Sequence, residues 1–245
     1  MKSLMKKVFA AAAAIATVFG LAATTVATAN AADGATLTVS TADAKFVGKT
    51  VNAYKMFSAT VGGEGANKAV SYTLTDTWKP FFMDSTASGL NGATDANVND
   101  KANEYVSELA GDNLVAFATK ASNWAQTQAK NITADKTATV SAGATNGNYT
   151  ATFTGLDYGY YVVAVPGALA NTSGQYATLV SVDSTNVNAN IKGSLPTVDK
   201  KVQVNGNGAD TADAKIGDTL TFTLTSTIPD MSAYDTYTFN FKDTL

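Results

Sequence analysis

Two lysines eight residues apart carry the most reactive chemistry in this sequence. The stretch from Asn186 to Val204 contains two alternating patterns that predict β-strands, and each strand holds one lysine. In the first strand Lys192 falls on the polar face with Asn188 and Asn190, whereas in the second strand Lys200 falls on the apolar face among three valines. We therefore expect one amine to face solvent and the other to lie in a core.

An amine buried in this way has an unusual chemistry. Burial disfavours the charged form of a lysine, and a neutral amine in an apolar pocket is a nucleophile. Asp243 follows Tyr237, Phe239 and Phe241 on one face of a later predicted strand, so it also points into a core, where a carboxyl group stays protonated. The pair fits condensation of Lys200 with an Asn side-chain amide, releasing ammonia. A buried ion pair, or a register that exposes both residues, explains the same pattern.

The composition excludes several other kinds of chemistry. The chain has no His and no Cys, so a Ser-His-Asp or Cys-His nucleophile and the usual zinc sites are absent. All 17 basic residues are Lys; without Arg, and with 20 acidic residues, specific binding of nucleic acid is not expected. We expect no metal, no cofactor and no enzyme acting on a diffusing substrate.

The first 31 residues have the pattern of an export signal. Three lysines precede an uncharged, Ala-rich apolar run, and small residues at Ala29 and Ala31 predict cleavage between Ala31 and Ala32. The alternative is a membrane anchor, but the run from Val8 to Ala23 is short for a spanning helix, which needs about 20 residues. We predict an exported protein with no membrane span after cleavage. Without Cys, such a protein has no disulfides to stabilise it.

Most of the remaining chain predicts short β-strands. Apolar residues alternate with Thr, Ser or Asn, and Gly, Asn and Asp separate the runs. This organisation predicts an all-β fold built from immunoglobulin-like β-sandwich domains in tandem. The predicted strands include residues 36–40, 51–57, 149–153, 159–165, 178–182, 220–224 and 236–241.

One segment has helical periodicity instead. Apolar residues recur at helical spacing from Ala102 to Leu109 and again from Leu114 to Ala125. Gly111 can end the first helix, and Asp112 or Asn113 can cap the second. We predict a helical hairpin inserted between strands. A lid over one edge of the sandwich is favoured over a binding role.

Leu195-Pro196 is the best domain boundary, because Pro does not fit a central strand. We expect a signal peptide at 1–31, a complete sandwich at 32–194, and the first part of another domain at 195–245. The last segment is too short for a whole immunoglobulin-like sandwich, which needs about 100 residues. The second domain is therefore expected to be incomplete in this sequence.

The order and spacing of these features resemble those of shaft (major) pilins of sortase-assembled Gram-positive fimbriae. Where that family has Y-P-K-N, this chain has Asn190-Ile191-Lys192-Gly193, and a second lysine follows at +8 in both. The run Gly155–Val163 resembles the family's G-L-x-x-G-Y-Y-L-V closing strand, and Phe241–Leu245 resembles part of its isopeptide-forming domain.

The resemblance implies a role for each residue. A pilin-specific sortase would join Lys192 to the LPxTG-type sorting signal of the next subunit, giving a cell-wall-attached fibre of copies of this chain with tip and base pilins. Lys200 would form an intramolecular isopeptide bond with an Asn beyond residue 245, and Asp243 would be its acid. Lys55 could serve the same purpose in the first domain, since it shares a predicted face with Val51, Ala53 and Phe57, but Asp157 is the nearest acid and we predict no such bond.

Two other functions fit the same sequence. A monomeric wall-anchored adhesin built from these modules would bind a host protein or glycan directly and would form no polymer. A secreted carbohydrate-active enzyme would need two paired carboxylates in a cleft, and the sequence contains no convincing pair.

Overall fold

The computed structural model describes residues 34–63, 68–127, 132–143, 147–167, 176–192, 198–204 and 207–226. Its helices are α1 (Lys79–Met83), α2 (Ser85–Ser88), α3 (Val98–Ser107) and α4 (Gly111–Gln126). Its strands are β1 (Ala35–Thr41), β2 (Thr50–Gly62), β3 (Ala69–Leu74), β4 (Lys136–Thr139), β5 (Ser141–Ala142), β6 (Tyr149–Leu156), β7 (Gly159–Ala164), β8 (Ala177–Val182), β9 (Asn186–Asn190), β10 (Val198–Val204), β11 (Asn207–Ala209) and β12 (Leu220–Ser226).

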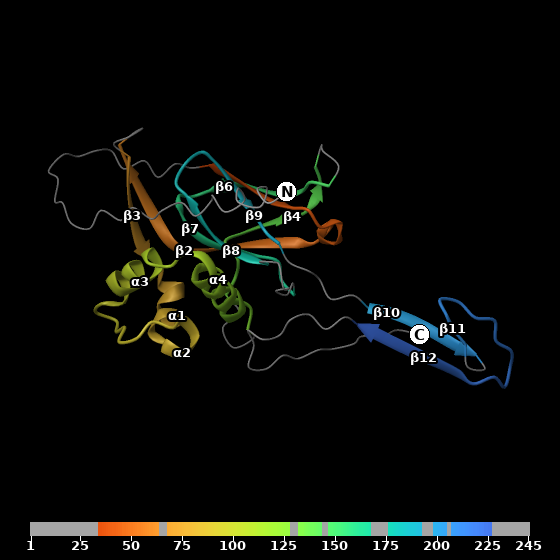
Figure 1. The fold of residues 1–245 in the computed structure, drawn as a ribbon. Helices are drawn as coiled ribbons and strands as arrows, with labels where there is room; N and C mark the ends of the chain where they lie inside the picture. The colour runs from red at the N-terminus through yellow and green to blue at the C-terminus, as the bar shows by residue number, and fades with distance from the viewer. Residues whose placement is uncertain are drawn as a thin grey trace, which may run out of the picture.

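Two sheets form the body of the fold. One has the strand order β5-β6-β1-β9; in the other, β2 pairs with β3, β4 and β7, and β7 pairs with β8. Their facing side chains belong to one continuous core that includes Leu37, Phe153, Val51 and Val163. The predicted β-sandwich is therefore confirmed, and Figure 1 shows the two sheets as neighbouring layers.

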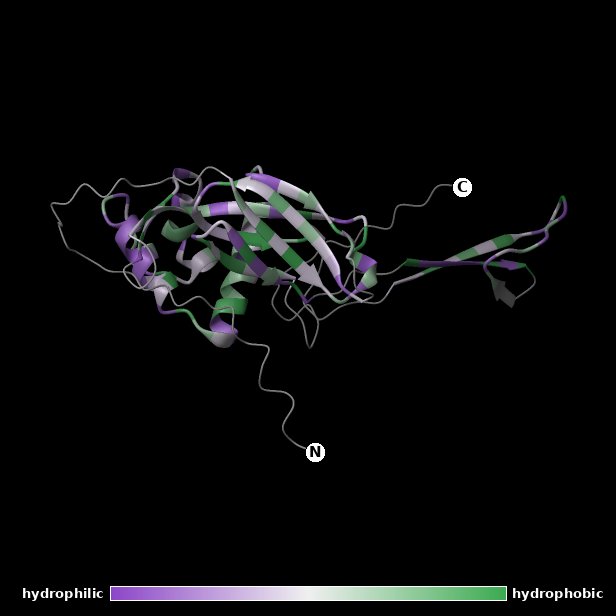
Figure 2. Cartoon of the chain, turned by 90° about the horizontal axis from the view of Figure 1, so that it is seen from above, coloured by the Kyte–Doolittle hydropathy of each residue, from purple (hydrophilic) through white to green (hydrophobic). Residues whose placement is uncertain are grey.

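Strand patterns follow from what lies on each face. β1 has one face in the core and one half-exposed, so its residues alternate between apolar and hydroxyl side chains. Every residue of β7 is buried, and its sequence is a continuous apolar and aromatic run. Such a run is typical of a strand covered on both faces. Figure 2 shows these changes of hydropathy along the strands.

The helical segment covers the face of β7 that does not pack on the other sheet. α4 packs against β7 and β8, and α3 packs against β3. In Figure 1 the helices lie on the side of this sheet that faces away from β6 and β9. The predicted helical hairpin exists, but it covers a face of the sheet, not an edge as expected. The physical reason is the number of aromatic side chains on this side, which need a whole face to bury them.

An aromatic cluster fills the space between the helices and the sheet. The Phe81 ring of α1 lies at its centre, with ring centroids 5.2–5.6 Å from those of four others, Trp78, Phe82, Phe117 and Trp124. The sequence did not predict α1 or α2, because each is a single short turn. Pro80 in the first turn suits the start of α1, and the Asp84 carboxylate accepts hydrogen bonds from two amides of α2.

The junction of the two longer helices differs from the expected one. α3 ends at Ser107, and Gly111 is the first residue of α4 with a φ of +53°, so it does not end the first helix. Ala110 precedes α4 in an extended conformation, and no side chain caps this helix through a hydrogen bond. The predicted caps at Asp112 and Asn113 are therefore wrong.

The remaining strands form a separate antiparallel sheet, in the order β11-β10-β12. Val204 pairs with Asn207, so β10 and β11 are antiparallel neighbours. Figure 1 shows this sheet extending away from the helices and the larger sheets. The predicted boundary at 194/195, the signal peptide at 1–31 and the strand at 236–241 lie outside the described residues.

The aromatic cluster generates a stability prediction. Phe81→Ala is expected to lower the free energy of unfolding by about 3–5 kcal/mol, because it removes a fully buried ring that contacts four others. Met83→Ala on the same helix is the matched control; its side chain is 37% exposed, and a change below about 1 kcal/mol is expected. Urea unfolding followed by tryptophan fluorescence measures both. Equal losses in the two variants would contradict this account of the core.

Three tyrosines make the fold sensitive to high pH. Burial raises the pKa of Tyr72, Tyr160 and Tyr161, and for Tyr161 the nearby carboxylates of Asp157 and Asp135 raise it further. The folded protein therefore keeps these protons at pH values where the unfolded chain, with tyrosines near pKa 10.0, loses them. The contribution of these tyrosines to stability is therefore fully present below about pH 10, where tyrosines of the unfolded chain are still protonated, and it is lost as the pH rises above this value.

The measurement is the urea midpoint from about pH 9 to about pH 11, with tyrosinate absorbance recorded in parallel. Tyr160→Phe should make the alkaline loss of stability shallower, since one raised group is removed. A midpoint that stays constant over this range would show that these tyrosines ionise equally in both states.

Candidate functional site

The structure places Lys192 at the end of an anchored strand. β9 runs parallel to β1, with Thr36 opposite Asn186 and Ser40 opposite Asn190. The amide of Ile191 donates a hydrogen bond of 3.0 Å to the carbonyl of Ser40, so the strand is held up to the residue before Lys192.

Side chains of this strand take the faces that the sequence predicts. Ala189 and Ile191 are buried in the sandwich core, whereas Asn188, Asn190 and Lys192 are exposed. The alternation of the pleat therefore brings the Lys192 amine to the surface of the first sandwich. This part of the sequence-based prediction is confirmed.

Lys200, in contrast to Lys192, lies on an apolar face of the β10–β12 sheet. In the β10–β12 pairing Lys200 is opposite Leu224 and Val202 is opposite Phe222, so these four side chains share one face. The Nζ of Lys200 lies over the ring of Phe222, 4.6 Å from its centroid. The predicted apolar face is confirmed, and Phe222 is a neighbour that the sequence pattern alone did not identify.

The predicted burial of Lys200 is not what the described residues show. Lys200 is half-buried, and on the same face Val198 is 61% and Phe222 37% exposed. Three strands expose this face because a sheet buries an apolar face only by packing it against a second layer. Asp243, the predicted acid, lies outside the described residues, as do Ala31 and Ala32 of the predicted cleavage site.

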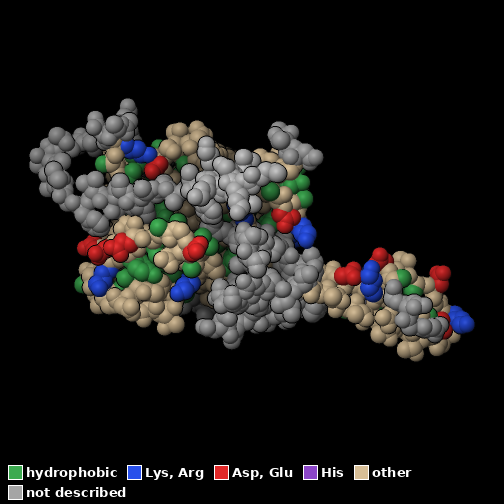
Figure 3. Space-filling model, viewed as in Figure 1, with side chains coloured by type: hydrophobic (Ala, Val, Ile, Leu, Met, Phe, Trp, Pro, Cys, Tyr) green, Lys and Arg blue, Asp and Glu red, His purple; other side chains and the backbone are tan. Residues whose placement is uncertain are grey.

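The other face of this small sheet is polar and charged. Lys201 pairs with Asp210 at 2.5 Å and with Asp199 at 3.8 Å between Nζ and carboxylate oxygen. The hydrogen bond to Asp210, with the charge of Asp199, raises the pKa of Lys201. Figure 3 shows acidic and basic side chains distributed along this sheet. Neighbouring lysines on β10 thus have opposite environments.

Lys55 has a carboxylate partner in the first sandwich. Its Nζ lies 2.7 Å from the Asp157 carboxylate, the acid that the sequence identifies as nearest. Its backbone amide also donates a 2.7 Å hydrogen bond to the Asp135 carboxylate, a contact that the sequence did not indicate. The Lys55 side chain is 20% exposed and that of Asp157 is 61% exposed, so this is a hydrated ion pair of the kind that adds little stability. The absence of an amide bond here stays a prediction.

Glycine at position 159 allows β7 to approach the backbone of β2 beside Lys55. A Cβ on Gly159 would lie 2.6 Å from the carbonyl oxygen of Phe57, which is too close, and 3.2 Å from Cδ of Lys55, which is a tight contact. The sequence pattern is wrong about one neighbour of Lys55: the Phe57 ring packs against Phe82 on the helical side. Lys55 is instead directly opposite Tyr161 in the β2–β7 pairing, and the Tyr161 side chain points away from the helical side.

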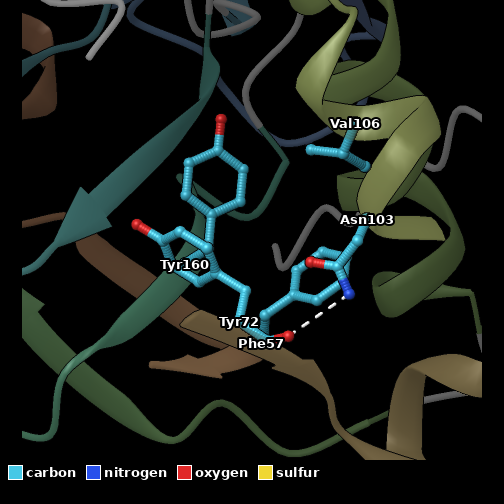
Figure 4. A pocket seen from close by; sticks show the side chains of 5 residues that line it. All are labelled: Phe57, Tyr72, Asn103, Val106 and Tyr160. Atoms are coloured by element: carbon cyan, nitrogen blue, oxygen red, sulfur yellow. Dashed lines mark hydrogen bonds between the residues drawn. The ribbon is translucent and has the colours of Figure 1, made fainter. Parts of the chain in front are cut away.

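A small hollow lies between the sheet and α3. Figure 4 shows its lining: Phe57, Tyr72, Asn103, Val106 and Tyr160. The Asn103 amide donates hydrogen bonds to the carbonyls of Tyr72 and Asn99, at 3.3 and 2.8 Å, and the Tyr72 hydroxyl is bonded to Ser181 at 2.7 Å. These polar groups serve the packing of α3 and β3 on the sheet. The hollow does not adjoin either lysine of the predicted site.

The part of the chain that the structure describes contains no group of three or more acidic side chains arranged to hold a metal ion. Its helices include none that is both long and apolar enough to cross a membrane.

Comparison with known proteins gives structural neighbours only. No family model matches this sequence, and no curated protein matches it. Among solved structures, the chain is similar to the T6 backbone pilin of serotype M6 Streptococcus pyogenes, with 18% identity and a TM-score of 0.35, over 80% of this chain and 36% of that one.

A second similar structure is the full-length major pilin SpaD from Corynebacterium diphtheriae, with 17% identity and a TM-score of 0.30. The match covers 82% of this chain and 38% of SpaD. The chain therefore spans less than two fifths of the length of either protein.

Proposed function

We propose that this chain is a structural subunit of a covalently polymerised cell-surface pilus and that Lys192 is its linking residue. The observation that carries the proposal is the position of Lys192: exposed, and immediately after a strand held in the sandwich by β1. An amine presented in this way can enter the active site of another protein while its own domain stays folded.

The linking step is an acyl transfer. A pilin-specific sortase holds the cleaved LPxTG-type signal of one subunit as a thioester. The neutral Lys192 amine attacks the acyl carbon, a C–N bond forms, the C–S bond breaks, and the amine loses a proton to solvent. The fixed strand end reduces the conformational entropy lost when the lysine docks. Repetition would join copies of this chain, with tip and base pilins at the ends of a fibre attached to the cell wall.

The second lysine would stabilise the subunit, not link it. Lys200 lies on the apolar face of the β10–β12 sheet. We propose that it forms an intramolecular amide bond with an Asn of its own domain, with Asp243 as the acid. Such a bond replaces the disulfides that a chain without Cys does not have. Beyond this single intramolecular reaction, which needs no cofactor, we propose no enzymatic activity.

Acyl transfer to Lys192 is tested with the chain as acceptor. Incubation with a pilin-class sortase and a labelled LPxTG peptide is expected to attach the peptide to Lys192, located by mass spectrometry of proteolytic fragments. Lys192→Arg should reduce labelling to background, because a guanidinium keeps the positive charge but does not deprotonate to a nucleophile.

Lys120→Ala is the matched control for this experiment. Lys120 is exposed on α4, so its loss removes one surface amine and should leave labelling unchanged. Undiminished labelling of the Lys192→Arg variant would exclude Lys192 as the linking residue. No labelling of the natural chain by several pilin-class sortases would favour the monomeric adhesin.

The amide bond of Lys200 is tested by intact mass. The full-length protein is expected to weigh less than the sum of its residues by one ammonia, and Lys200→Ala should remove this deficit because no amine remains to condense. Lys201→Ala, which changes the neighbouring lysine on the outer face, should keep it. A full-length protein without the deficit would refute the bond.

A further inference from the structure

The turn between β1 and β2, residues 42–49, lies beside the proposed linking lysine. Because β9 runs parallel to β1, the two strands end at the same end of the sandwich, with Ser40 opposite Asn190. The Ile191 amide donates a hydrogen bond to the Ser40 carbonyl, so Lys192 follows where β1 passes into the turn. Figures 1 and 2 both show the turn as a short coil on the side of the body from which the chain continues to β10.

This β1–β2 turn is fixed by hydrogen bonds and by one buried ring. The ring of Phe46 is fully buried in the sandwich core. The Asp43 carboxylate accepts a hydrogen bond of 2.9 Å from the Lys45 amide, which caps the single 3-10 turn in this segment. Val140 forms two backbone hydrogen bonds to the β1–β2 turn, of 2.8 and 2.9 Å. A surface held in this way loses little conformational entropy when a partner binds.

The exposed side chains of the β1–β2 turn are basic and apolar. Lys45 and Lys49 are exposed on the turn, and Lys192 is exposed next to it. Among the described residues, neither turn lysine is paired with a carboxylate. Val47, between the two turn lysines, is 44% exposed. The turn holds one acid, Asp43, against these three positive charges, whereas the chain as a whole has a net charge of −3. This end of the sandwich therefore carries the opposite sign of charge to the whole chain.

We propose that the β1–β2 turn is the docking surface for the pilin-class sortase that transfers the acyl group to Lys192. This inference rests on the proposed function and adds the surface that brings the enzyme to the amine. The charge of Lys45 and Lys49 fits an enzyme with acidic side chains beside its thioester, and Val47 fits an apolar contact between them. Opposite charges at the rim of an interface speed up encounter and orient the partners.

A docking surface has a clear use in this reaction, because the thioester has a competing acceptor. Water hydrolyses a thioester, so the amine must reach the acyl carbon before water does. Binding at the rigid β1–β2 turn raises the effective concentration of the Lys192 amine at the thioester. Loss of the surface is therefore expected to weaken the encounter and to leave the chemistry of the bound complex unchanged.

The test measures labelling of Lys192 in the full chain by a pilin-class sortase, with a saturating labelled LPxTG peptide and a range of chain concentrations. The double variant Lys45→Glu/Lys49→Glu is expected to raise the KM for the chain about five- to tenfold at low salt, with kcat unchanged. Lys45→Gln/Lys49→Gln should give an intermediate KM, because it removes the charges without reversing them. In about 0.5 M NaCl these differences should shrink, because salt screens exposed charges.

The matched control is Lys120→Glu/Lys215→Glu. It makes the same change in net charge at two exposed lysines, one on α4 and one in the connection between β11 and β12. Its KM should stay within about twofold of that of the natural chain. Val47→Ala tests the apolar contact without a change of charge, and it should raise the KM about two- to threefold at low and high salt alike.

Two kinetic results would overturn the proposal. One is a KM of the Lys45→Glu/Lys49→Glu variant equal to that of the control, and the other is a lower kcat with an unchanged KM. Binding of the natural chain to phosphatidylglycerol vesicles, lost in this variant while its KM is unchanged, would assign the turn to a membrane instead. Each of these results leaves Lys192 as the labelled residue and removes only the docking surface. No labelling of Lys192 in the natural chain would instead refute the proposed function, and this surface with it.

Discussion

The pleat of the β-strand is the constraint on which the arrangement of this protein depends. Successive side chains point to opposite faces, so an even or odd spacing decides which residues meet water. In β9 this puts Ile191 into the core and Lys192 at the surface, and in β10 it puts Lys200 and Lys201 on opposite faces. A shift of one residue in either strand would exchange these roles.

The layers around β7 give the first unit a large buried core without disulfides. One face of its sheet packs on the β1–β6–β9 sheet and the other on the helices, so every residue of β7 is buried. On the helical side, the buried apolar surface is mainly that of the aromatic cluster around Phe81. The Lys55–Asp157 pair is hydrated and adds little to this. The stability of this unit therefore comes from apolar burial, whereas the β10–β12 sheet leaves much of its apolar face exposed.

Three lysines of this chain have different surroundings. Lys192 stands at the surface at the end of an anchored strand, Lys55 forms a hydrated ion pair, and Lys200 lies over an aromatic ring. In a chain with no Cys, His or Arg, the surroundings of each lysine decide what it can do. The proposed division between a linking lysine and a stabilising lysine follows from that difference.

The sequence by itself determined the fold class, most strands and the faces of Lys192 and Lys200, because alternation is a local property of neighbouring residues. It also predicted the helical hairpin from its period. Only the tertiary structure decided that the helices cover a face, that Phe57 packs against Phe82, and that Phe222 is the neighbour of Lys200. These contacts join residues far apart in the chain, and they depend on strand register and on how layers pack, which no local pattern specifies.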